Sequence, residues 1–185
     1  MEDINLDSEL SYDILIPQER VAVLIGKDGE TKKLIEEQAN CKLNITKDGE
    51  VNVSGNDGLT LYTAKEIVKA IGRGFNPRIA LLLLKTDYTL ELVDMKDIAG
   101  KSKNDLERLK GRVIGKGGKS REEIERMTET YISIYGKTIG IIGEQVQVSL
   151  SRQAIAKLLE GAMHTTVFKF LERKKKDQLF GQQPG

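Results

Sequence analysis

The chain lacks several features that define common protein classes. Its 185 residues include one cysteine, Cys41, which excludes an internal disulfide and fits a reducing compartment. Tryptophan is absent, and aromatic residues make up 5% of the chain. The longest apolar run, IALLLL at 79–84, is too short to cross a bilayer, and no signal-peptide pattern is found. We therefore expect a cytoplasmic protein with no membrane partner.

Candidates for metal or catalytic chemistry are equally scarce. Cys41 has no cysteine partner for a metal ion, and we interpret it as a buried strand residue. His164, the single histidine, has no constellation of ligands around it and is interpreted as structural. The loop GKGGKS at 115–120 ends like a nucleoside-triphosphate-binding loop, but Val113 stands where that motif needs its first glycine. We expect no catalytic residue, no metal and no cofactor.

Charge is distributed unevenly along the chain, although the net value is only +1. Residues 1–86 carry 11 basic and 14 acidic side chains, whereas residues 87–185 carry 18 and 14. Within 96–121, nine basic residues accompany three acidic ones. Such a run is often only a solvated helix face. This one ends at the glycine-rich loop, so a polyanion site is also open. For ERKKK at 172–176, a solvated helix end and contact with phosphates are both open.

An internal repeat is the clearest pattern in the chain. The segment VAVLIGKDGETKKLIEEQANCKLNIT (21–46) resembles KGRVIGKGGKSREEIERMTETYISIY (110–135). Each contains Ile-Gly-Lys-x-Gly after an apolar stretch, then a charged helix-forming segment and an alternating strand. The loops begin at Gly26 and Gly115, 89 positions apart. Because the flanking pattern is copied with the loop, coincidence explains it poorly.

Hydrophobic periodicity, together with the residues that begin and end helices and strands, predicts the same order of elements in both halves: strand, helix, GxxG loop, helix, two strands and helix. In the first half we predict strands at 12–17, 41–46 and 50–54, and helices at 19–25, 30–39, 60–71 and 76–84. In the second half we predict strands at 88–95, 131–135 and 138–142, and helices at 102–113, 120–129 and 152–174.

Both repeats resemble the K-homology (KH) RNA-binding domain. That domain has an aliphatic pair, Ile-Gly-x-x-Gly, a helix and a strand with alternating aliphatic residues, and the order of elements here is similar to type I. The resemblance implies an α+β fold with two type I KH domains. Each is a three-stranded antiparallel sheet packed on three helices, with a GxxG loop. We expect KH domain 1 at 8–84, KH domain 2 at 85–176, and flexible ends at 1–7 and 177–185.

A closer resemblance covers nearly the whole chain. GRGFNP (72–77), the ALLLL helix, DYTLELVDM (87–95) and GRVIGKGGKSREEIERMTETYISIYGKTIGIIG (111–143) resemble the tandem-KH ribosome-assembly proteins of archaea and eukaryotes, the "partner of Nob" family. The resemblance implies a non-catalytic adaptor that binds single-stranded rRNA or pre-rRNA of the small subunit, near the 3′ end of its 16S/18S part. It also implies protein partners: a maturation endonuclease and other ribosome-assembly or translation factors.

Each loop combines features that suit RNA phosphates. Glycines let the backbone turn sharply and approach a ligand, the following helix N-terminus favours anions, and nearby cations add charge. The candidate phosphate-binding residues are Gly115, Lys116, Gly117, Gly118, Lys119, Arg121 and Arg112 in the second half, and Gly26, Lys27, Asp28, Gly29 and Lys32 in the first. By resemblance, the walls of the base-binding groove are Leu24, Ile25 and Leu43 in one domain, and Val113, Ile114 and Ile134 in the other. These apolar residues could equally be core.

Asp28 departs from the KH pattern, because a carboxylate beside a phosphate is unfavourable. We therefore expect the second domain to be the main phosphate clamp. Two other functions stay open: a protein-interaction module that keeps the KH folds, and a phosphohydrolase that uses Lys119 and Ser120.

Overall fold

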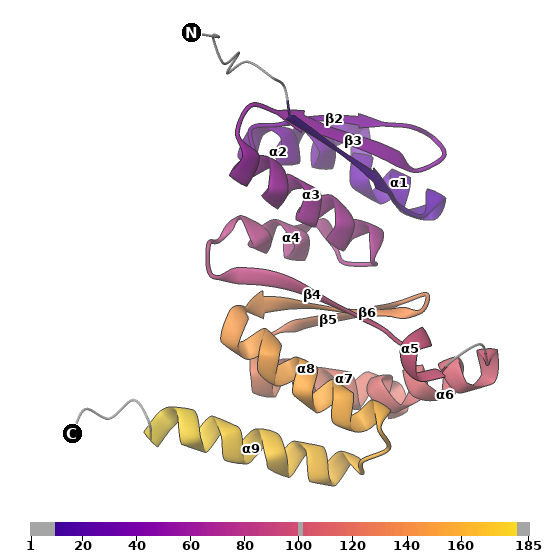
Figure 1. The fold of residues 1–185 in the computed structure, drawn as a ribbon, viewed down its shortest axis with the longest axis vertical. Helices are drawn as coiled ribbons and strands as arrows, with labels where there is room; N and C mark the ends of the chain where they lie inside the picture. Colours follow the sequence, from indigo (N-terminus) through magenta and orange to yellow (C-terminus); the bar gives the residue numbers. More distant parts are fainter. Residues whose placement is uncertain (1–9, 100–101, 181–185) are drawn as a thin grey trace, which may run out of the picture. The chain divides into compact units, whose positions relative to one another are not determined.

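The computed structural model describes residues 10–99 and 102–180, and the chain divides into two compact units at residues 1–86 and 87–185 (Figure 1). We call them unit 1 and unit 2. The flexible end expected at 1–7 lies outside the described residues. So does most of the one expected at 177–185, but the last helix continues to Phe180.

Unit 1 is a sheet with helices packed against one face (Figure 1). The antiparallel sheet has the order β1–β3–β2, with β1 at Leu10–Leu15, β2 at Lys42–Ile45 and β3 at Glu50–Gly55. The helical elements are α1 (Gln18–Ile25), the 3-10 turn η1 (Lys27–Gly29), α2 (Glu30–Gln38), α3 (Gly58–Gly72), α4 (Pro77–Ala80) and the 3-10 turn η2 (Leu81–Leu84). Their order is the predicted one.

Capping residues set two of the helix starts in unit 1. The Asp57 carboxylate accepts a hydrogen bond from the N–H of Thr60 at 2.8 Å, which begins α3 and lowers the pKa of Asp57. Asn76 accepts from the N–H of Arg78 at 2.9 Å, and Pro77 follows as the first residue of α4. The sequence therefore fixes the start of both helices locally.

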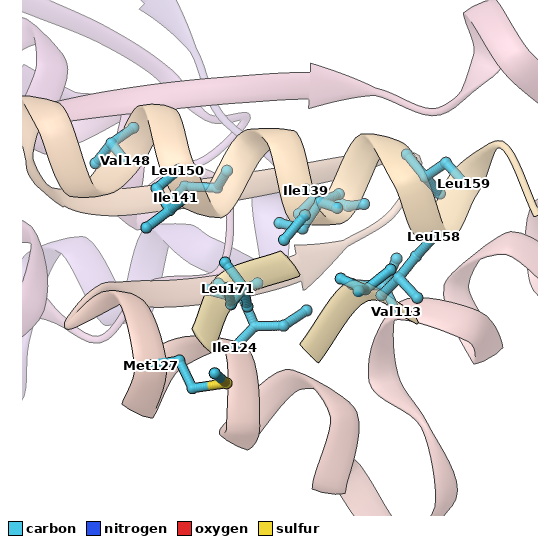
Figure 2. Close-up of a cluster of buried hydrophobic side chains, with 14 of the residues drawn as sticks. Val113, Ile124, Met127, Ile139, Ile141, Val148, Leu150, Leu158, Leu159 and Leu171 are labelled. Atoms are coloured by element: carbon cyan, nitrogen blue, oxygen red, sulfur yellow. The ribbon is translucent and has the colours of Figure 1, made fainter. Parts of the chain in front are cut away.

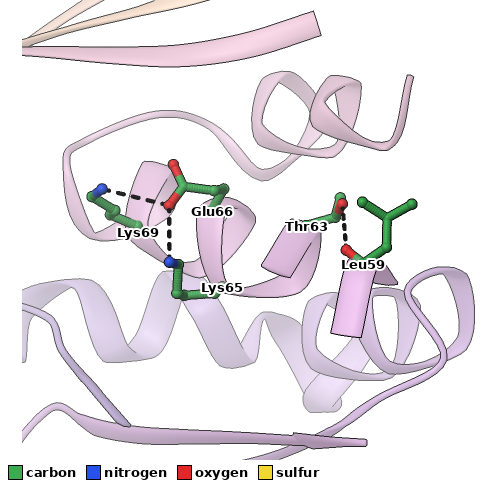
Figure 3. Close-up of polar contacts among 5 residues, drawn as sticks. All are labelled: Leu59, Thr63, Lys65, Glu66 and Lys69. Atoms are coloured by element: carbon green, nitrogen blue, oxygen red, sulfur yellow. Dashed lines mark hydrogen bonds and ion pairs between the residues drawn. The ribbon is translucent and has the colours of Figure 1, made fainter. Parts of the chain in front are cut away.

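The outer side of α3 carries short-range polar contacts (Figure 3). The Glu66 carboxylate lies 3.8 Å from the Lys65 ammonium and 3.5 Å from that of Lys69. The Thr63 hydroxyl donates to the Leu59 carbonyl at 3.1 Å. Partly exposed pairs of this kind contribute little to stability. The opposite side holds the helix in place, through the buried residues Leu61, Ala64, Ile67, Val68 and Ile71.

Unit 2 repeats this arrangement and extends it. Its antiparallel sheet has the order β4–β6–β5, with β4 at Tyr88–Asp94, β5 at Tyr131–Tyr135 and β6 at Thr138–Glu144. The helical elements are α5 (Lys96–Ala99), α6 (Lys103–Ile114), the 3-10 turn η3 (Lys116–Gly118), α7 (Lys119–Thr128), α8 (Gln145–Leu159) and α9 (His164–Phe180). The sequence analysis did not predict α5. Helix α9 packs on α7 and α8, on their side away from the sheet (Figure 1).

The prediction of one continuous helix at 152–174 is wrong. The structure has two helices, and Gly161 between them has a φ of +104°. Its N–H bonds to the Leu158 carbonyl at 3.1 Å, and the N–H of Ala162 bonds to the Lys157 carbonyl at 2.9 Å. This is the Schellman arrangement that ends helices at a left-handed residue. The apolar period continues across the break, which is why the sequence pattern did not reveal it.

The core of unit 2 lies between the sheet and its helices (Figure 2). The labelled side chains are Val113 from α6, Ile124 and Met127 from α7, Ile139 and Ile141 from β6, Val148, Leu150, Leu158 and Leu159 from α8, and Leu171 from α9. Four helices therefore share one apolar cluster, which gives the loop between α6 and α7 a rigid base.

Candidate nucleic-acid interface

Both glycine loops form the same backbone turn. In degrees, the φ/ψ pairs are 75/175 at Gly26, 52/25 at Asp28 and 77/13 at Gly29, against 71/177 at Gly115, 62/26 at Gly117 and 82/−2 at Gly118. In each loop, the N–H of the last glycine bonds to the carbonyl of the first at 3.3 Å. The repeat seen in the sequence is therefore also a repeat of geometry.

The first glycine of each loop packs tightly on the start of the next helix. A Cβ at Gly115 would lie 2.5 Å from the Cβ of Ser120, and one at Gly26 would lie 2.7 Å from the nitrogen of Thr31. The Ser120 hydroxyl is buried and has no hydrogen-bond partner among the described residues. A nucleotide-binding loop needs this hydroxyl on a magnesium ion. Its burial argues against the phosphohydrolase alternative.

The third position of each loop requires a left-handed backbone. Gly117 occupies it in unit 2, and Asp28, with φ of +52°, occupies it in unit 1. Aspartate and asparagine tolerate this conformation better than other side chains do. Asp28 is thus one of the few residues other than glycine that fit here. The sequence analysis noted its charge and missed its conformation.

The second loop presents cations that no described residue engages in an ion pair. Lys116 and Lys119 are exposed and form no ion pair with any described residue. Lys119 also begins α7, and no side chain in the described part of the chain caps that helix at Gly118. The free N–H groups and the dipole of the helix start therefore lie beside two lysines, which together favour an anion. In the first loop Lys27 is exposed, but the exposed Asp28 follows it.

The predicted cation Arg121 already has a partner. Its Nε lies 3.6 Å from the Glu125 carboxylate, which also accepts a hydrogen bond from the N–H of Ile132 at 2.6 Å. Burial raises the pKa of Glu125, while the strand N–H and Arg121 act in the opposite direction. The same contacts recur 89 residues earlier between Lys32, Glu36 and Leu43, at 3.8 and 2.8 Å. We therefore place Arg121 and Lys32 at the margin of each site, where they pair with the glutamates that hold the strand to the helix.

Arg112, which we predicted to contact phosphate, is engaged by carbonyls of its own unit, so we place it behind the loop. Its Nε and Nη2 donate to the carbonyls of Leu158 and Ala162 at 2.7 and 2.6 Å, at the end of α8. Its own carbonyl lies 2.8 Å from Nε2 of His164, which gives the histidine the structural role expected for it. In unit 1, Arg20 donates in the same way to carbonyls at and beyond the end of α3. Arg112 is a helix cap that happens to lie three residues before the loop.

Half of the predicted groove walls belong to the core. Leu24, Leu43 and Val113 are 0%, 1% and 0% exposed, so a base cannot touch them without a rearrangement. Periodicity correctly predicts that these three residues lie on the inward face of their helix or strand. It does not show which inward residues are covered by other helices and which line a groove.

Ile114, Ile25 and Ile134 remain as candidate walls. Ile114 is 36% exposed, and the other two are half-buried. Ile45, which the sequence analysis missed, is also half-buried and corresponds to Ile134 in the repeat. The 89-residue offset would have identified it. Each unit thus has one isoleucine before the loop and one at the end of a strand that can contact a base.

Other kinds of site find little support in the described residues. Among them, no three His, Cys, Asp or Glu side chains gather as a metal site. Within the same residues, no helix combines the length and the hydropathy of a membrane span. Cys41 is buried, and burial raises the pKa of its thiol to about 11.

The strand order and the placement of GxxG between two helices define a KH domain of type I, and the chain contains two. A family model of the KH domain matches residues 11–70. A second model, that of the second KH domain of PNO1, is described as a eukaryotic type KH-domain (KH-domain type I) and matches residues 89–176.

The chain belongs to the tandem-KH family that includes PNO1 and archaeal Dim2p. It is 48% identical over 176 residues to KH domain-containing protein MJ0443 of Methanocaldococcus jannaschii, covering 92% of this chain and 77% of that protein. It is 33% identical over 113 residues to RNA-binding protein PNO1 of Oryzias latipes, covering 60% of this chain. That alignment spans 46% of the relative, less than half its length.

Two solved structures from Pyrococcus horikoshii OT3 have the same fold. Dim2p superposes with a TM-score of 0.83 at 41% identity, over 89% of this chain and 99% of that one. The aDim2p chain in a complex of a/eIF2alpha, aDim2p and rRNA gives a TM-score of 0.86 at 41% identity, over 92% and 97%.

Proposed function

We propose that the chain is a single-stranded RNA-binding adaptor in small ribosomal subunit maturation. One observation carries the proposal: two exposed lysines, unpaired among the described residues, flank the uncapped start of α7 beside the partly exposed Ile114. Relatives point to the kind of RNA. One solved homologue is in a complex with rRNA, and two relatives are named pre-rRNA-processing proteins. The finer proposal is that the ligand lies near the 3′ end of 16S-type rRNA, in the cytoplasm.

The geometry of unit 2 supports a binding mode for one strand of RNA. Type I KH domains clamp about four nucleotides of single-stranded RNA with this loop. A phosphate lies against the start of α7 between Lys116 and Lys119, and the bases lie against Ile114 and Ile134. Aliphatic walls can contact a splayed base without stacking, so the low aromatic content is no obstacle.

Protein partners form a further part of the proposal. We include a maturation endonuclease and a translation factor, because the resemblance to the partner-of-Nob family implies both. The complex of a homologue with a/eIF2alpha supports the second. Co-purification of the chain with each candidate, with and without RNA, tests this part separately.

The central experiment compares the two loops in the full chain. A fluorescein-labelled oligonucleotide with the 3′-terminal sequence of 16S rRNA is titrated with wild type, with the double variant Lys116→Asp, Gly117→Asp, and with Lys27→Asp. We expect the second-loop variant to lose most of its affinity and the first-loop variant to lose less. A wild-type chain that does not bind the oligonucleotide refutes the proposal. Equal losses, or a larger one from Lys27→Asp, reverse the ranking of the loops.

A protein-interaction role for unit 1 is the second candidate. Asp28 is exposed within the loop, and residues 1–86 carry 11 basic against 14 acidic side chains. If Lys27→Asp leaves RNA affinity unchanged, unit 1 has another role in the assembly, and co-purification with Asp28→Asn, which the left-handed backbone tolerates, would then identify lost protein partners.

A further inference from the structure

A basic hollow of about 400 Å³ lies on unit 2, and none of the GxxG residues lines it. Its lining consists of Lys157 from α8 and of Thr166, Lys169, Phe170 and Arg173 from α9. The spacing of the α9 residues puts them on one side of that helix. The opposite side of α9 is fixed in the core through the buried Val167 and Leu171.

The hollow has no carboxylate in its lining. Lys157, Lys169 and Arg173 form no ion pair with any residue that the structure describes. The Lys157 ammonium lies 5.0 Å from the centre of the Phe170 ring, so the aromatic side chain forms part of the floor and the cations form the rim. Three like charges in one hollow repel each other. An anionic ligand would offset this repulsion.

Hydrogen bonds connect the helices that form the hollow to the helix that precedes the loop. Arg112 precedes Gly115 by three residues and donates to the carbonyl of Leu158, the neighbour of Lys157. The Arg112 carbonyl meets the His164 ring, at the first residue of α9. The end of α8 and the start of α9 are therefore tied to the last turn of the helix that leads into the loop. An RNA strand on the loop and a ligand in the hollow bind the same rigid unit.

We propose that this hollow is a second phosphate-binding surface for the same RNA, used by nucleotides outside the four that the loop clamps. The inference rests on the proposed RNA-binding function. The chemistry supports phosphates: cations without an ion pair among the described residues, an aromatic ring and a threonine hydroxyl suit the backbone of a single strand. An acidic protein segment is the other ligand of matching charge, and the test distinguishes it.

The test uses the full chain and single-stranded RNAs of two lengths, about five and about fifteen nucleotides, since the loop alone holds about four. The variant is Lys157→Gln, Lys169→Gln, Arg173→Gln. We expect it to bind the short RNA like wild type and the long RNA at least about tenfold more weakly. Each lost phosphate contact lowers the salt slope of log K by about 0.7 for single strands, so three lower it by about 2.

A charge-matched control is Lys42→Gln, Lys47→Gln, Arg78→Gln in unit 1, at three exposed positions. It should leave the slope for long RNA near the wild-type value. Unchanged binding of long RNA by the α8–α9 variant overturns the inference and points to an acidic protein ligand. Equal losses for both RNA lengths also overturn it, because the hollow would then not serve additional nucleotides. If wild type binds neither RNA, the proposed function itself has failed.

Discussion

The third position of the GxxG loop is glycine in unit 2 and aspartate in unit 1, and the backbone there is left-handed in both. Substitutions at this position can therefore separate the effect of backbone conformation on RNA binding from the effect of side-chain charge. Gly117 is exposed, and a Cβ built on it meets nothing within 4 Å. A side chain added there changes the surface that a phosphate approaches and leaves the packing of the unit intact.

Replacing Gly117 by aspartate is expected to weaken RNA binding at least about fivefold, because like charges at an interface are unfavourable. Gly117→Asn is the matched control, since asparagine tolerates the same backbone and carries no charge. Anisotropy titrations of both variants give the comparison. If both lose affinity equally, the bulk of the side chain is responsible and the electrostatic explanation of Asp28 is mistaken.

Cys41 makes a second prediction at the scale of one residue. Its thiol is 9% exposed, and burial, followed by the nearby Glu36, raises its pKa to about 11 from the usual 9.0. The native chain should therefore react with iodoacetamide very slowly at pH 8 and rapidly only in urea, as measured by mass spectrometry. The unfolded thiol ionises first, so the free energy of unfolding should fall as pH rises from 9 to 11. Fast alkylation of the native chain at pH 8 would contradict the burial of this side chain.

At the scale of elements, Arg112 links α6 to the end of α8. Arg112→Gln should lower the free energy of unfolding by about 1–3 kcal/mol, since it removes charged hydrogen bonds to helix-end carbonyls. RNA affinity of the folded chain should stay unchanged. Lys116→Gln should do the opposite, with weaker binding and the same stability. Urea unfolding followed by circular dichroism, alongside titration, measures both. A large loss of RNA affinity from Arg112→Gln in a stable chain would return Arg112 to the binding site.

The order of the elements could be predicted from the sequence, because local signals decide it. Each GxxG loop lies between two segments of helical period, and in the structure Asp57 and Asn76 cap helix starts close to the predicted ones. Prediction failed where periodicity is ambiguous. Helix α8 begins at Gln145, whereas we predicted a start at 152. The prediction began too late because the alternating valines after Gln145 are typical of a strand.

The candidate site was predictable only in part, for a physical reason. The loop glycines and lysines carry their chemistry in the residue type, so a motif reveals them. Whether Val113 or Ile114 faces a ligand depends on which of them another helix covers. Arg112 donates hydrogen bonds to carbonyls about fifty positions away in the sequence. Long-range packing of this kind leaves no trace in local spacing.

At the scale of the whole molecule, the charge imbalance follows the boundary between the two units. Residues 1–86 have 11 basic and 14 acidic side chains, and residues 87–185 have 18 and 14. RNA binding should therefore depend on salt mainly through unit 2. Several phosphate contacts predict a slope of about −2 to −4 in log K against log salt. Titrations at several potassium chloride concentrations measure it, with Lys116→Gln reducing the slope by about 0.7. A flat response would remove the electrostatic basis of the site.

The left-handed residue in the loop also has a genetic consequence. Every glycine codon begins with two guanines, and one change at the second base gives aspartate when the third is a pyrimidine. Aspartate is tolerated by this backbone, whereas lysine and arginine are strained in it. Mutation can therefore lower the charge at this position in one step with little strain, whereas a one-step change to arginine raises the charge and strains the backbone. In a chain with two KH domains, one base change can thus weaken phosphate binding by one domain. That domain can then acquire a different ligand while the other still binds RNA.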